Sequence, residues 1–235
     1  MLAITPNILA KFLNFCSKYV FILSLILSSI AAILIILLEN DYYQGISFKI
    51  MFVHVPTAWL SLLIFFTMGV SSIIGLVFKS PTSFTISRAL SPIGLIMSII
   101  VLITGSIWGN LTWGTYWVWD ARLTSMLILA FIYLGHILLL NSFDHFQKSD
   151  FAASILAIIG LVNLPIVKFS VDWWTTLHQG ASVFKVGGPS MTNDYLITLL
   201  LCFAALFSLC FYWFSNIFYI ITENRRIERI KLLNQ

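Results

Sequence analysis

The sequence predicts an all-α integral membrane protein with six transmembrane helices and both termini in the cytoplasm. Of its 235 residues, 60% are hydrophobic and only 9% are charged, whereas soluble domains carry about 25% charged residues. The apolar runs last about 20 residues, as a helix crossing the hydrocarbon core requires, rather than the roughly 10 alternating residues of a barrel strand. We therefore expect residues 1–235 to form a single transmembrane domain.

The first three spans are predicted where charged residues are absent. All six predicted spans cover residues 19–38, 59–78, 89–108, 123–143, 151–167 and 195–221. The first run is longer than the apolar core of a secretory signal and ends at polar residues 39–41, so we expect it to be retained. In the second, Pro56 suits the first turn of a helix, which leaves His54 at the mouth of the span. A polar turn with Lys79 and Arg88 precedes the third.

The last three spans are separated by two longer polar segments and a short one. A tryptophan-rich loop, predicted over residues 108–122, joins the third span to the fourth, and the polar turn 144–150 joins the fourth to the fifth. A second loop over 168–194 contains His178 and leads into the sixth span. Residues 222–235 follow as a basic tail.

The positions of lysine and arginine predict the orientation, because these residues collect on the cytoplasmic side. One side holds nine of them, namely Lys11, Lys18, Lys79, Arg88, Lys148, Arg225, Arg226, Arg229 and Lys231, and the other holds four, namely Lys49, Arg122, Lys168 and Lys185. Both termini are then cytoplasmic, and both loops and the His54 mouth face the outer compartment. Three separate segments rich in aromatic residues and histidines are thus expected on one face.

Several classes of protein are excluded or disfavoured by missing motifs. None of the three cysteines forms a C-x-x-C pair or a C-x-x-C-H haem attachment site, so the chain is neither a thiol oxidoreductase nor a c-type cytochrome. It contains no P-loop, so ATP is hydrolysed elsewhere in any assembly that uses it. The net charge of +4 gives no reason to expect a nucleic-acid partner. No nucleophile with a base is evident, and we expect no enzymatic activity.

Two of the four histidines are candidates for iron ligands. His54 and His178 are predicted on the same face, and a pair of neutral imidazoles can hold haem iron from both sides. His136 is deep in the fourth span, where a polar residue is a functional candidate by default, but nearer the other face. His145 belongs to the cytoplasmic turn. Hydrogen-bonded interfacial histidines are the alternative, and zinc is a weaker one because cysteine and carboxylate partners are lacking.

The tryptophan cluster can be a porphyrin platform or an interfacial anchor. Trp and Tyr are enriched at bilayer interfaces as anchors, which suffices for Trp59 and Trp213. Trp113, Trp117 and Trp119 instead fall within seven residues beside glycines, and indole rings supply area for stacking on a flat ligand. The propionates of a porphyrin would need cations. The candidates on this face are Lys49, Arg122, Lys168 and Lys185.

Residues 113–120, WGTYWVWD, match the pattern Trp-Gly-x-x-Trp-x-Trp-Asp at every fixed position. This is the signature of the WWD haem-handling membrane proteins, and within them the chain resembles the CcmC family from the first span to the sixth. The contexts His54-Val55-Pro56 and Leu177-His178-Gln179 strengthen the resemblance. Trp108 falls outside the motif, at its rim.

The resemblance implies a function. Proteins of this family hold haem b non-covalently, as cargo, at the outer face of the inner membrane of bacteria or of some mitochondria. They present it to the haem chaperone CcmE, together with the transporter subunits CcmA and CcmB and the small CcmD. The axial ligands then fall on His54 and His178, and Trp113, Trp117 and Trp119 on the porphyrin face.

Three further residues receive roles. Gly114 lets the backbone approach closely, and Asp120 fixes the loop through backbone amides or Arg122. The alternatives are a WWD-group cytochrome c haem lyase, whose relatives tend to be larger, and a b-type electron-transfer subunit, which usually has paired histidines inside the bundle. A purely structural subunit would leave the tryptophan cluster unexplained.

Overall fold

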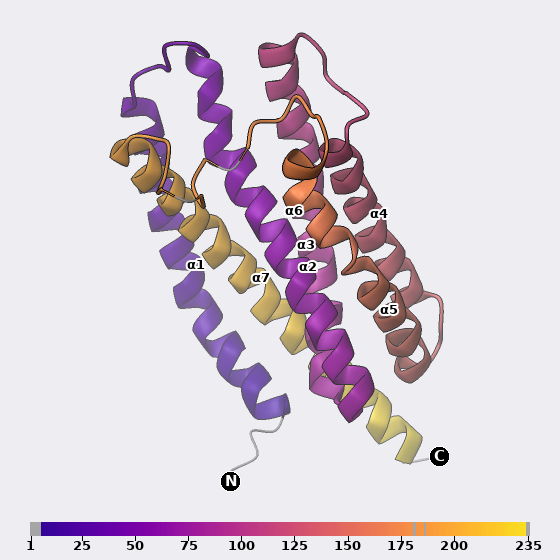
Figure 1. Ribbon diagram of the computed structural model, residues 1–235. Coiled ribbons are helices and arrows are strands. Elements are labelled where there is room, and N and C mark those ends of the chain that lie inside the picture. The colour runs from indigo at the N-terminus through magenta and orange to yellow at the C-terminus, as the bar shows by residue number, and fades with distance from the viewer. Residues whose placement is uncertain (1–5, 181, 186, 234–235) are drawn as a thin grey trace.

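The structure is a computed structural model that describes residues 6–180, 182–185 and 187–233 (Figure 1). It is all-helical, which confirms the predicted fold class. The elements are α1 (Pro6–Leu37), the 3-10 helix η1 (Ile46–Ile50), α2 (Met51–Phe78), α3 (Pro81–Trp113), α4 (Ala121–Asn141), α5 (Phe146–Gly160), α6 (Asn163–Trp173) and α7 (Asn193–Leu233). The described residues contain no strand, only an isolated bridge between Asp41 and Gly45.

Six helical segments are long and apolar enough to cross a membrane, as predicted, with α5 and α6 together forming the fifth. Four helices extend well beyond the predicted spans: α1 begins at Pro6, α2 begins at Met51, α3 runs on to Trp113 and α7 continues to Leu233. Extension of a formed helix adds one hydrogen bond per residue at little cost. The helices therefore continue into polar sequence that hydropathy assigns to loops and tails.

The fifth span is broken near its middle rather than continuous over 151–167. Helix α5 ends at Gly160, and α6 starts at Asn163 with Pro165 in its first turn, where the missing N–H costs nothing. Gly160 lets the helices approach, because a Cβ there would lie 2.6 Å from the ring of Phe65. The side-chain amide of Asn163 donates to the carbonyl of Ser125 over 2.9 Å and fastens the break to α4.

Helices α2 and α3 pack closely through small polar residues. The hydroxyls of Ser61 and Ser98 lie 2.7 Å apart, and those of Ser72 and Ser87 lie 3.0 Å apart. Small residues let helix backbones approach in lipid, where dispersion and interhelical hydrogen bonds replace the hydrophobic effect. This pair forms the rigid centre of the bundle and carries part of the site described below.

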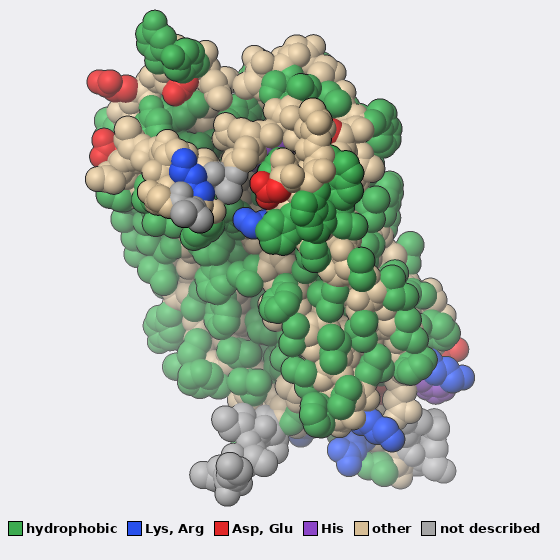
Figure 2. Space-filling model, viewed as in Figure 1, with side chains coloured by type: hydrophobic (Ala, Val, Ile, Leu, Met, Phe, Trp, Pro, Cys, Tyr) green, Lys and Arg blue, Asp and Glu red, His purple; other side chains and the backbone are tan. Residues whose placement is uncertain are grey.

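The surface of the bundle is hydrophobic over its middle and charged towards its two ends. Hydrophobic side chains cover the middle of the face shown in Figure 2, and charged ones lie towards its ends. Helix α1 carries many of the exposed apolar residues, such as Phe12, Phe15 and Ile22, each more than half exposed. Such a surface fits a hydrocarbon environment.

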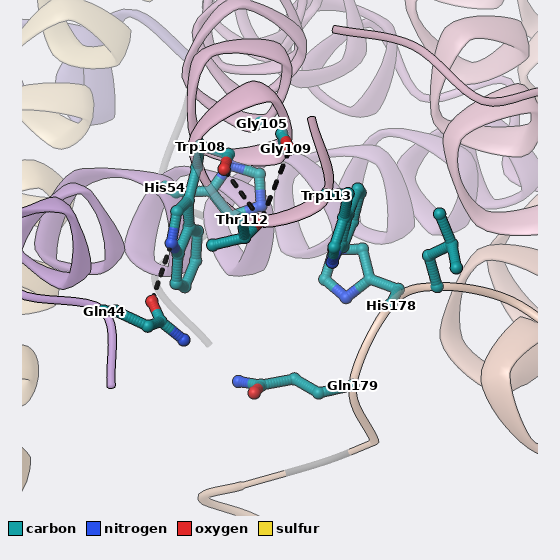
Figure 3. A pocket seen from close by; sticks show the side chains of 10 residues that line it. Gln44, His54, Gly105, Trp108, Gly109, Thr112, Trp113, His178 and Gln179 are labelled. Carbon is teal, nitrogen blue, oxygen red and sulfur yellow. Dashed lines mark hydrogen bonds between the residues drawn. The ribbon is translucent and has the colours of Figure 1, made fainter. Parts of the chain in front are cut away.

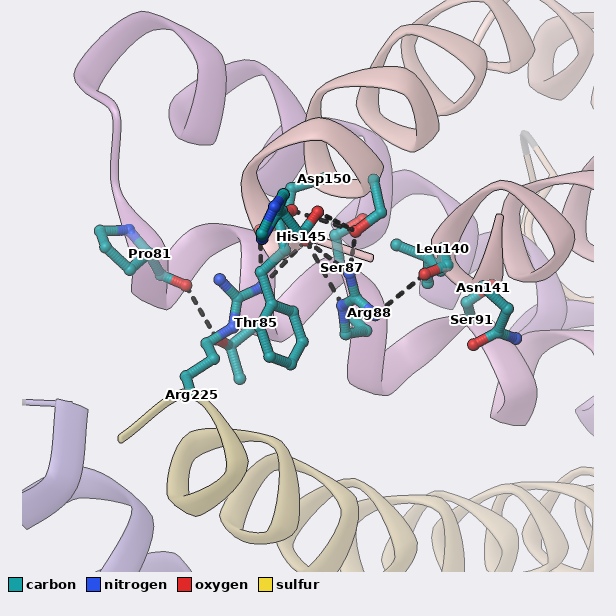
Figure 4. Close-up of polar contacts among 12 residues, drawn as sticks. Pro81, Thr85, Ser87, Arg88, Ser91, Leu140, Asn141, His145, Asp150 and Arg225 are labelled. Carbon is teal, nitrogen blue, oxygen red and sulfur yellow. Dashed lines mark hydrogen bonds and ion pairs between the residues drawn. The ribbon is translucent and has the colours of Figure 1, made fainter. Parts of the chain in front are cut away.

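At one end of the bundle, a buried ion cluster joins three helices (Figure 4). Asp150 of α5 is 3% exposed and accepts hydrogen bonds from Arg88 of α3 at 3.0 Å and from Arg225 of α7 at 2.7 Å. Both guanidinium groups also lie over the ring of Phe146, at 4.7 and 4.5 Å. The segment 222–235, predicted as a basic tail, is therefore the helical end of α7 as far as Leu233, and one of its arginines is held inside the fold.

Both ends of the described chain, in α1 and α7, lie at the end of the bundle that holds this ion cluster (Figure 1). The connections before η1, between α3 and α4 and between α6 and α7 lie at the opposite end. This arrangement confirms that the three segments singled out in the sequence lie on one face. Which compartment that face meets stays a prediction from the positive charges.

Candidate functional site

The three segments meet around a cavity of about 210 Å³ at the end opposite the termini (Figure 3). Helix α2 contributes His54, and the last turns of α3 contribute Gly105, Trp108 and Trp113. The loop over residues 174–192, shorter than the predicted 168–194 because α6 runs on to Trp173, contributes His178. The sequence prediction that these segments converge is confirmed.

His54 lies inside α2 rather than at the mouth of a span that begins at residue 59. Helix η1 leads directly into α2, so Pro56 sits within the helix, and the imidazole is only 8% exposed. Its ring lies close to α3 because residue 105 is glycine: a Cβ there would be 2.9 Å from Cε1 of His54. Hydropathy misses this helical start because η1 contains Lys49.

The ring nitrogen Nδ1 of His54 is 3.0 Å from the hydroxyl oxygen of Thr104. That hydroxyl in turn donates its own proton to the carbonyl of Ile100, over 2.7 Å. The imidazole is thereby fastened to α3 through Nδ1. Among the described residues, nothing forms a hydrogen bond with its Nε2.

His178 is held by its loop and by α4. Its backbone N–H donates to the hydroxyl of Thr176 over 3.0 Å, and its Nδ1 lies 3.4 Å from Nη1 of Arg122. Burial, and then the positive charge of Arg122, lower the pKa of His178 from 6.5 to about 4. The imidazole is therefore neutral near pH 7, which is the form that ligates metals.

The two imidazole rings face each other across the cavity. Their centroids are 6.3 Å apart, and their planes differ by 26°. A metal ion with metal–nitrogen bonds of about 2.0 Å to each of two imidazoles would place the ring centroids roughly 6 Å apart. The centroid separation in the structure matches this value.

The tryptophans divide into two groups. Trp113 lies edge-on to His178 at 5.8 Å, and Trp108 lies edge-on to His54 at 5.8 Å, so each histidine has an indole beside it. Trp108, which the motif places at the rim, is thus part of the site. Trp117 packs edge-on against Trp119 at 5.4 Å, and Trp119 is 75% exposed. Trp119 is absent from the lining of the three cavities that the described residues form beside the histidines, whereas Trp117 lines the smallest of them together with both histidines.

The remaining motif residues shape the short connection over residues 114–120. Gly114 has φ 76°, a left-handed conformation that ends α3, and its N–H donates to the carbonyl of Asn110. No described atom lies within 4 Å of a Cβ built there, so within the protein it is the turn that requires glycine, and the close approach expected from the sequence stays a prediction. Asp120 caps α4 by accepting from the N–H of Leu123 at 2.8 Å, which confirms the prediction that it fixes the loop through backbone amides.

A second cavity of about 420 Å³ opens from the same histidines between α2 and α6. Most of its lining is apolar and includes Trp59, but it also holds three cations and one carboxylate, namely Arg122, Lys168, Lys185 and Asp172. Of the four predicted cations, only Lys49 does not line this cavity. Its ammonium donates to the carbonyl of Ile36 over 3.3 Å. A ligand reaching from the histidines into this cavity would meet an apolar wall and positive charge.

The other two histidines lie away from this site. His136 is 1% exposed, and its nitrogens contact the hydroxyls of Ser91 at 3.0 Å and Ser87 at 3.3 Å. His145 is exposed at the far end, beside Glu228. Across the described chain there is no group of three or more His, Cys, Asp and Glu side chains that could hold a metal ion by themselves. The histidine pair would therefore need further ligands from the cargo itself.

Comparison with known families decides the relationship. The model of the family described as CcmC, heme exporter protein C, matches residues 2–231. The chain belongs to the CcmC family. Its relatives in this family include the heme exporter protein C of Bradyrhizobium diazoefficiens, which is 48% identical over 175 residues, 74% of this chain and 66% of that protein. The heme exporter protein C of Haemophilus influenzae is 41% identical over 198 residues, 83% and 80% of the two chains.

One similar protein carries a mitochondrial name. A putative cytochrome c biosynthesis ccmC-like mitochondrial protein of Marchantia polymorpha is 45% identical over 188 residues, 80% of this chain and 77% of that protein. Membership of the CcmC family agrees with the resemblance drawn from the motif, and the six apolar helices make the chain a membrane protein.

Three site residues were not identified from the sequence. They are Gln44, Thr104 and Gly105. Trp108 donates from its indole N–H to the side-chain oxygen of Gln44 over 2.9 Å (Figure 3). The spacing of Gly105, Trp108 and Thr112 along α3 is that of one helix face. This periodicity would have placed Trp108 in the site, but nothing in the sequence pairs Thr104 with His54.

Proposed function

We propose that this chain binds haem b, non-covalently and as cargo, at the outer face of the membrane and hands it to a haem chaperone. In this proposal the iron lies between His54 and His178, and the porphyrin extends into the adjoining cavities. The chain changes the location of the haem and not its chemical bonds, so the function is transport rather than enzymatic catalysis.

One observation carries the proposal: the imidazole rings of His54 and His178 lie with their centroids 6.3 Å apart. Two nitrogen ligands and no third protein ligand are what a porphyrin requires, because the macrocycle itself supplies the four equatorial nitrogens. A structural zinc site would instead use four protein ligands. The donor set therefore favours haem over a bare metal ion.

The surroundings of the histidines suit a porphyrin. Trp108 and Trp113 provide indole rings beside the two imidazoles, and aromatic rings favour contact with flat apolar ligands. The indole N–H of Trp117 is buried and has no partner among the described residues, so a carboxylate or carbonyl of a ligand could satisfy it. Arg122, Lys168 and Lys185 line the larger cavity and are the candidates for pairing with the propionates.

The place in the cell and the partners follow from the family. Relatives are named heme exporter protein C and cytochrome c biosynthesis protein, which supports a role in delivering haem for c-type cytochromes. We propose the chaperone CcmE as the acceptor, the transporter subunits CcmA and CcmB and the small CcmD as partners, and the bacterial or mitochondrial inner membrane as the location. The excess of Lys and Arg at the end with the termini supports an outward-facing site.

The electron-transfer alternative finds no support in the bundle. His136 is the histidine buried deep among the spans, and it contacts two serine hydroxyls instead of a second histidine. A haem lyase remains distinguishable by its product, because a lyase joins haem covalently to an apocytochrome and a carrier does not.

The proposal is tested by purifying the protein in detergent and measuring its haem. We expect b-type haem in the pyridine haemochrome assay, extractable with acidified acetone, and transfer of that haem to purified apo-chaperone. A protein that neither contains haem nor binds it on titration would contradict the proposal. Covalent haem on an added apocytochrome would instead make the chain a lyase.

A further inference from the structure

We infer that the two histidines are unequal ligands: Thr104 sets His54 as the fixed iron ligand, whereas Arg122 opposes ligation by His178 and makes it the exchangeable one. This inference rests on the proposed haem binding and assigns roles to two residues that act through the ligands. Thr104 is a positioning residue, because it touches His54 and lines none of the three cavities described beside the histidines.

The hydrogen bonds of Thr104 fix the proton on the His54 ring. A hydroxyl has one proton, and that of Thr104 is donated to the carbonyl of Ile100 at 2.7 Å. Towards His54, 3.0 Å away, the hydroxyl oxygen can then only accept, so Nδ1 of the ring must carry the proton. The neutral ring is left with its lone pair on Nε2. That is the tautomer that ligates iron through Nε2, and it is held before any ligand arrives.

The position of His54 is as fixed as its proton. The ring extends from one long helix and is bonded to another, and it is packed over Gly105 with the edge of Trp108 beside it. Ligation by His54 therefore needs no movement of the backbone.

Arg122 has the reverse effect on His178. A guanidinium can only donate, so the contact between its Nη1 and Nδ1 of His178, at 3.4 Å, makes Nδ1 the acceptor. In the neutral ring the proton then sits on Nε2 and occupies the lone pair that iron would use. Ligation through Nε2 requires Arg122 to leave and the proton to pass to Nδ1. His178 also belongs to a loop, not a helix, so it can move without disturbing the bundle.

The asymmetry gives an order to loading and release. Arg122 also lines the larger cavity, so a porphyrin carboxylate placed there would draw the guanidinium off His178 and allow its ring to ligate. On release, Arg122 returns to Nδ1 and competes with the iron. A ligand from an acceptor protein would thus replace His178 first, while His54 still holds the haem.

The first test compares three variants of the full-length protein in detergent, by titration with ferric haem followed by absorption and electron paramagnetic resonance. Loss of an outer hydrogen bond to a metal ligand typically costs about 10- to 100-fold in affinity, so Thr104→Val is expected to bind haem at least about 10-fold more weakly. Thr104→Ser keeps the hydroxyl and should bind like wild type. Thr67→Val is the matched control, because the Thr67 hydroxyl bonds only to its own helix, at Leu63.

The second test asks which ligand exchanges. In His178→Gly, added imidazole should restore the six-coordinate low-spin spectrum, because His54 still holds the iron. In His54→Gly, haem should be lost and imidazole should restore little. In Arg122→Gln, with both histidines present, the replacement of His178 by imidazole should be slower than in wild type.

The outcomes separate the inference from the proposed function. The role of Thr104 would be overturned if wild type binds haem and Thr104→Val binds it with the same affinity. It would also be overturned if Thr104→Ser binds haem as weakly as Thr104→Val does. Retention of haem by His54→Gly but not by His178→Gly would reverse the assignment of the ligands. If wild type itself showed no histidine-ligated haem, the proposed function would fall, and this inference with it.

Discussion

A Cβ atom at Gly105 of α3 would lie 2.9 Å from Cε1 of His54, so the imidazole occupies space that any other residue at 105 would fill. Gly105→Ala is therefore expected to push the ring away from Thr104 and to weaken haem binding by about 10-fold, the lower end of the cost of losing a ligand's outer hydrogen bond. Haem titration of the purified variant measures this. Gly135→Ala is the control, because the Cβ there meets only the end of the Leu156 side chain, at 3.1 Å. Equal binding by the two variants would contradict the role given to Gly105.

The tryptophans of the motif should differ in importance. Trp113 touches His178, whereas Trp119 is 75% exposed and packs on Trp117. We expect Trp113→Ala to lower haem affinity severalfold, since an aromatic contact contributes about 0.5–1.5 kcal/mol beyond its area. Trp119→Ala should bind haem nearly as wild type does in detergent, and any loss should appear in transfer to the chaperone. Equal loss of affinity in both variants would mean that the exposed indole also contacts the porphyrin.

The imidazole of His178 should stay unprotonated at a lower pH than an ordinary histidine does. Burial and Arg122 lower its pKa to about 4 in the folded protein, against 6.5 in the unfolded chain. The unfolded chain therefore binds the proton first, and the stability contributed by neutral His178 is complete above pH 6.5 and lost as the pH falls towards 4. The unfolding midpoint of the haem-free protein should fall over this range, and less in His178→Gln. At pH 5.5 the haem spectrum should still be that of two histidine ligands, and conversion to a five-coordinate spectrum there would contradict the lowered pKa.

The ion cluster at the opposite end should govern stability rather than haem binding. Asp150 is the carboxylate shared by Arg88 and Arg225, all three in a largely buried setting. Removing one partner from a buried cluster typically costs about 3–5 kcal/mol, because the remaining charge is left uncompensated. Asp150→Asn should lower the thermal unfolding midpoint by several degrees, with haem stoichiometry unchanged in the folded fraction.

The control for this prediction is Glu223→Gln. Glu223 pairs with Arg226 at 3.4 Å near the surface, where ion pairs contribute little. A midpoint for Asp150→Asn no lower than that of Glu223→Gln would show that the cluster is not needed for stability.

The fold was largely predictable because lipid leaves few options. Long apolar runs must be helices, and the count of six follows directly. The ends of the helices were not predictable from hydropathy, since η1 and the first turn of α2 include Lys49, and α7 continues through its arginines to Leu233. The break after Gly160 depends on packing against Phe65, a contact between segments far apart in the sequence.

The sequence was sufficient to predict that His54 and His178 lie together, but not to predict the residues that hold them in place. The motif, the histidine contexts and the distribution of charges together predicted that His54 and His178 lie on one face. The hydrogen bonds of Thr104 and Arg122 depend on the register between helices, which no single segment encodes. The same holds for Trp108, whose place beside His54 follows only once α3 is known to run on to Trp113.

The most direct test of the central claim is the absorption spectrum of four purified proteins: wild type, His54→Ala combined with His178→Ala, and two controls. The controls are His145→Ala, at the far end, and His136→Ala, in the bundle. We predict that wild type and the two controls, once folded, carry haem with a low-spin Soret band and that the double variant carries almost none. A double variant with the haem content and Soret band of wild type would show that the iron is not held between these two histidines.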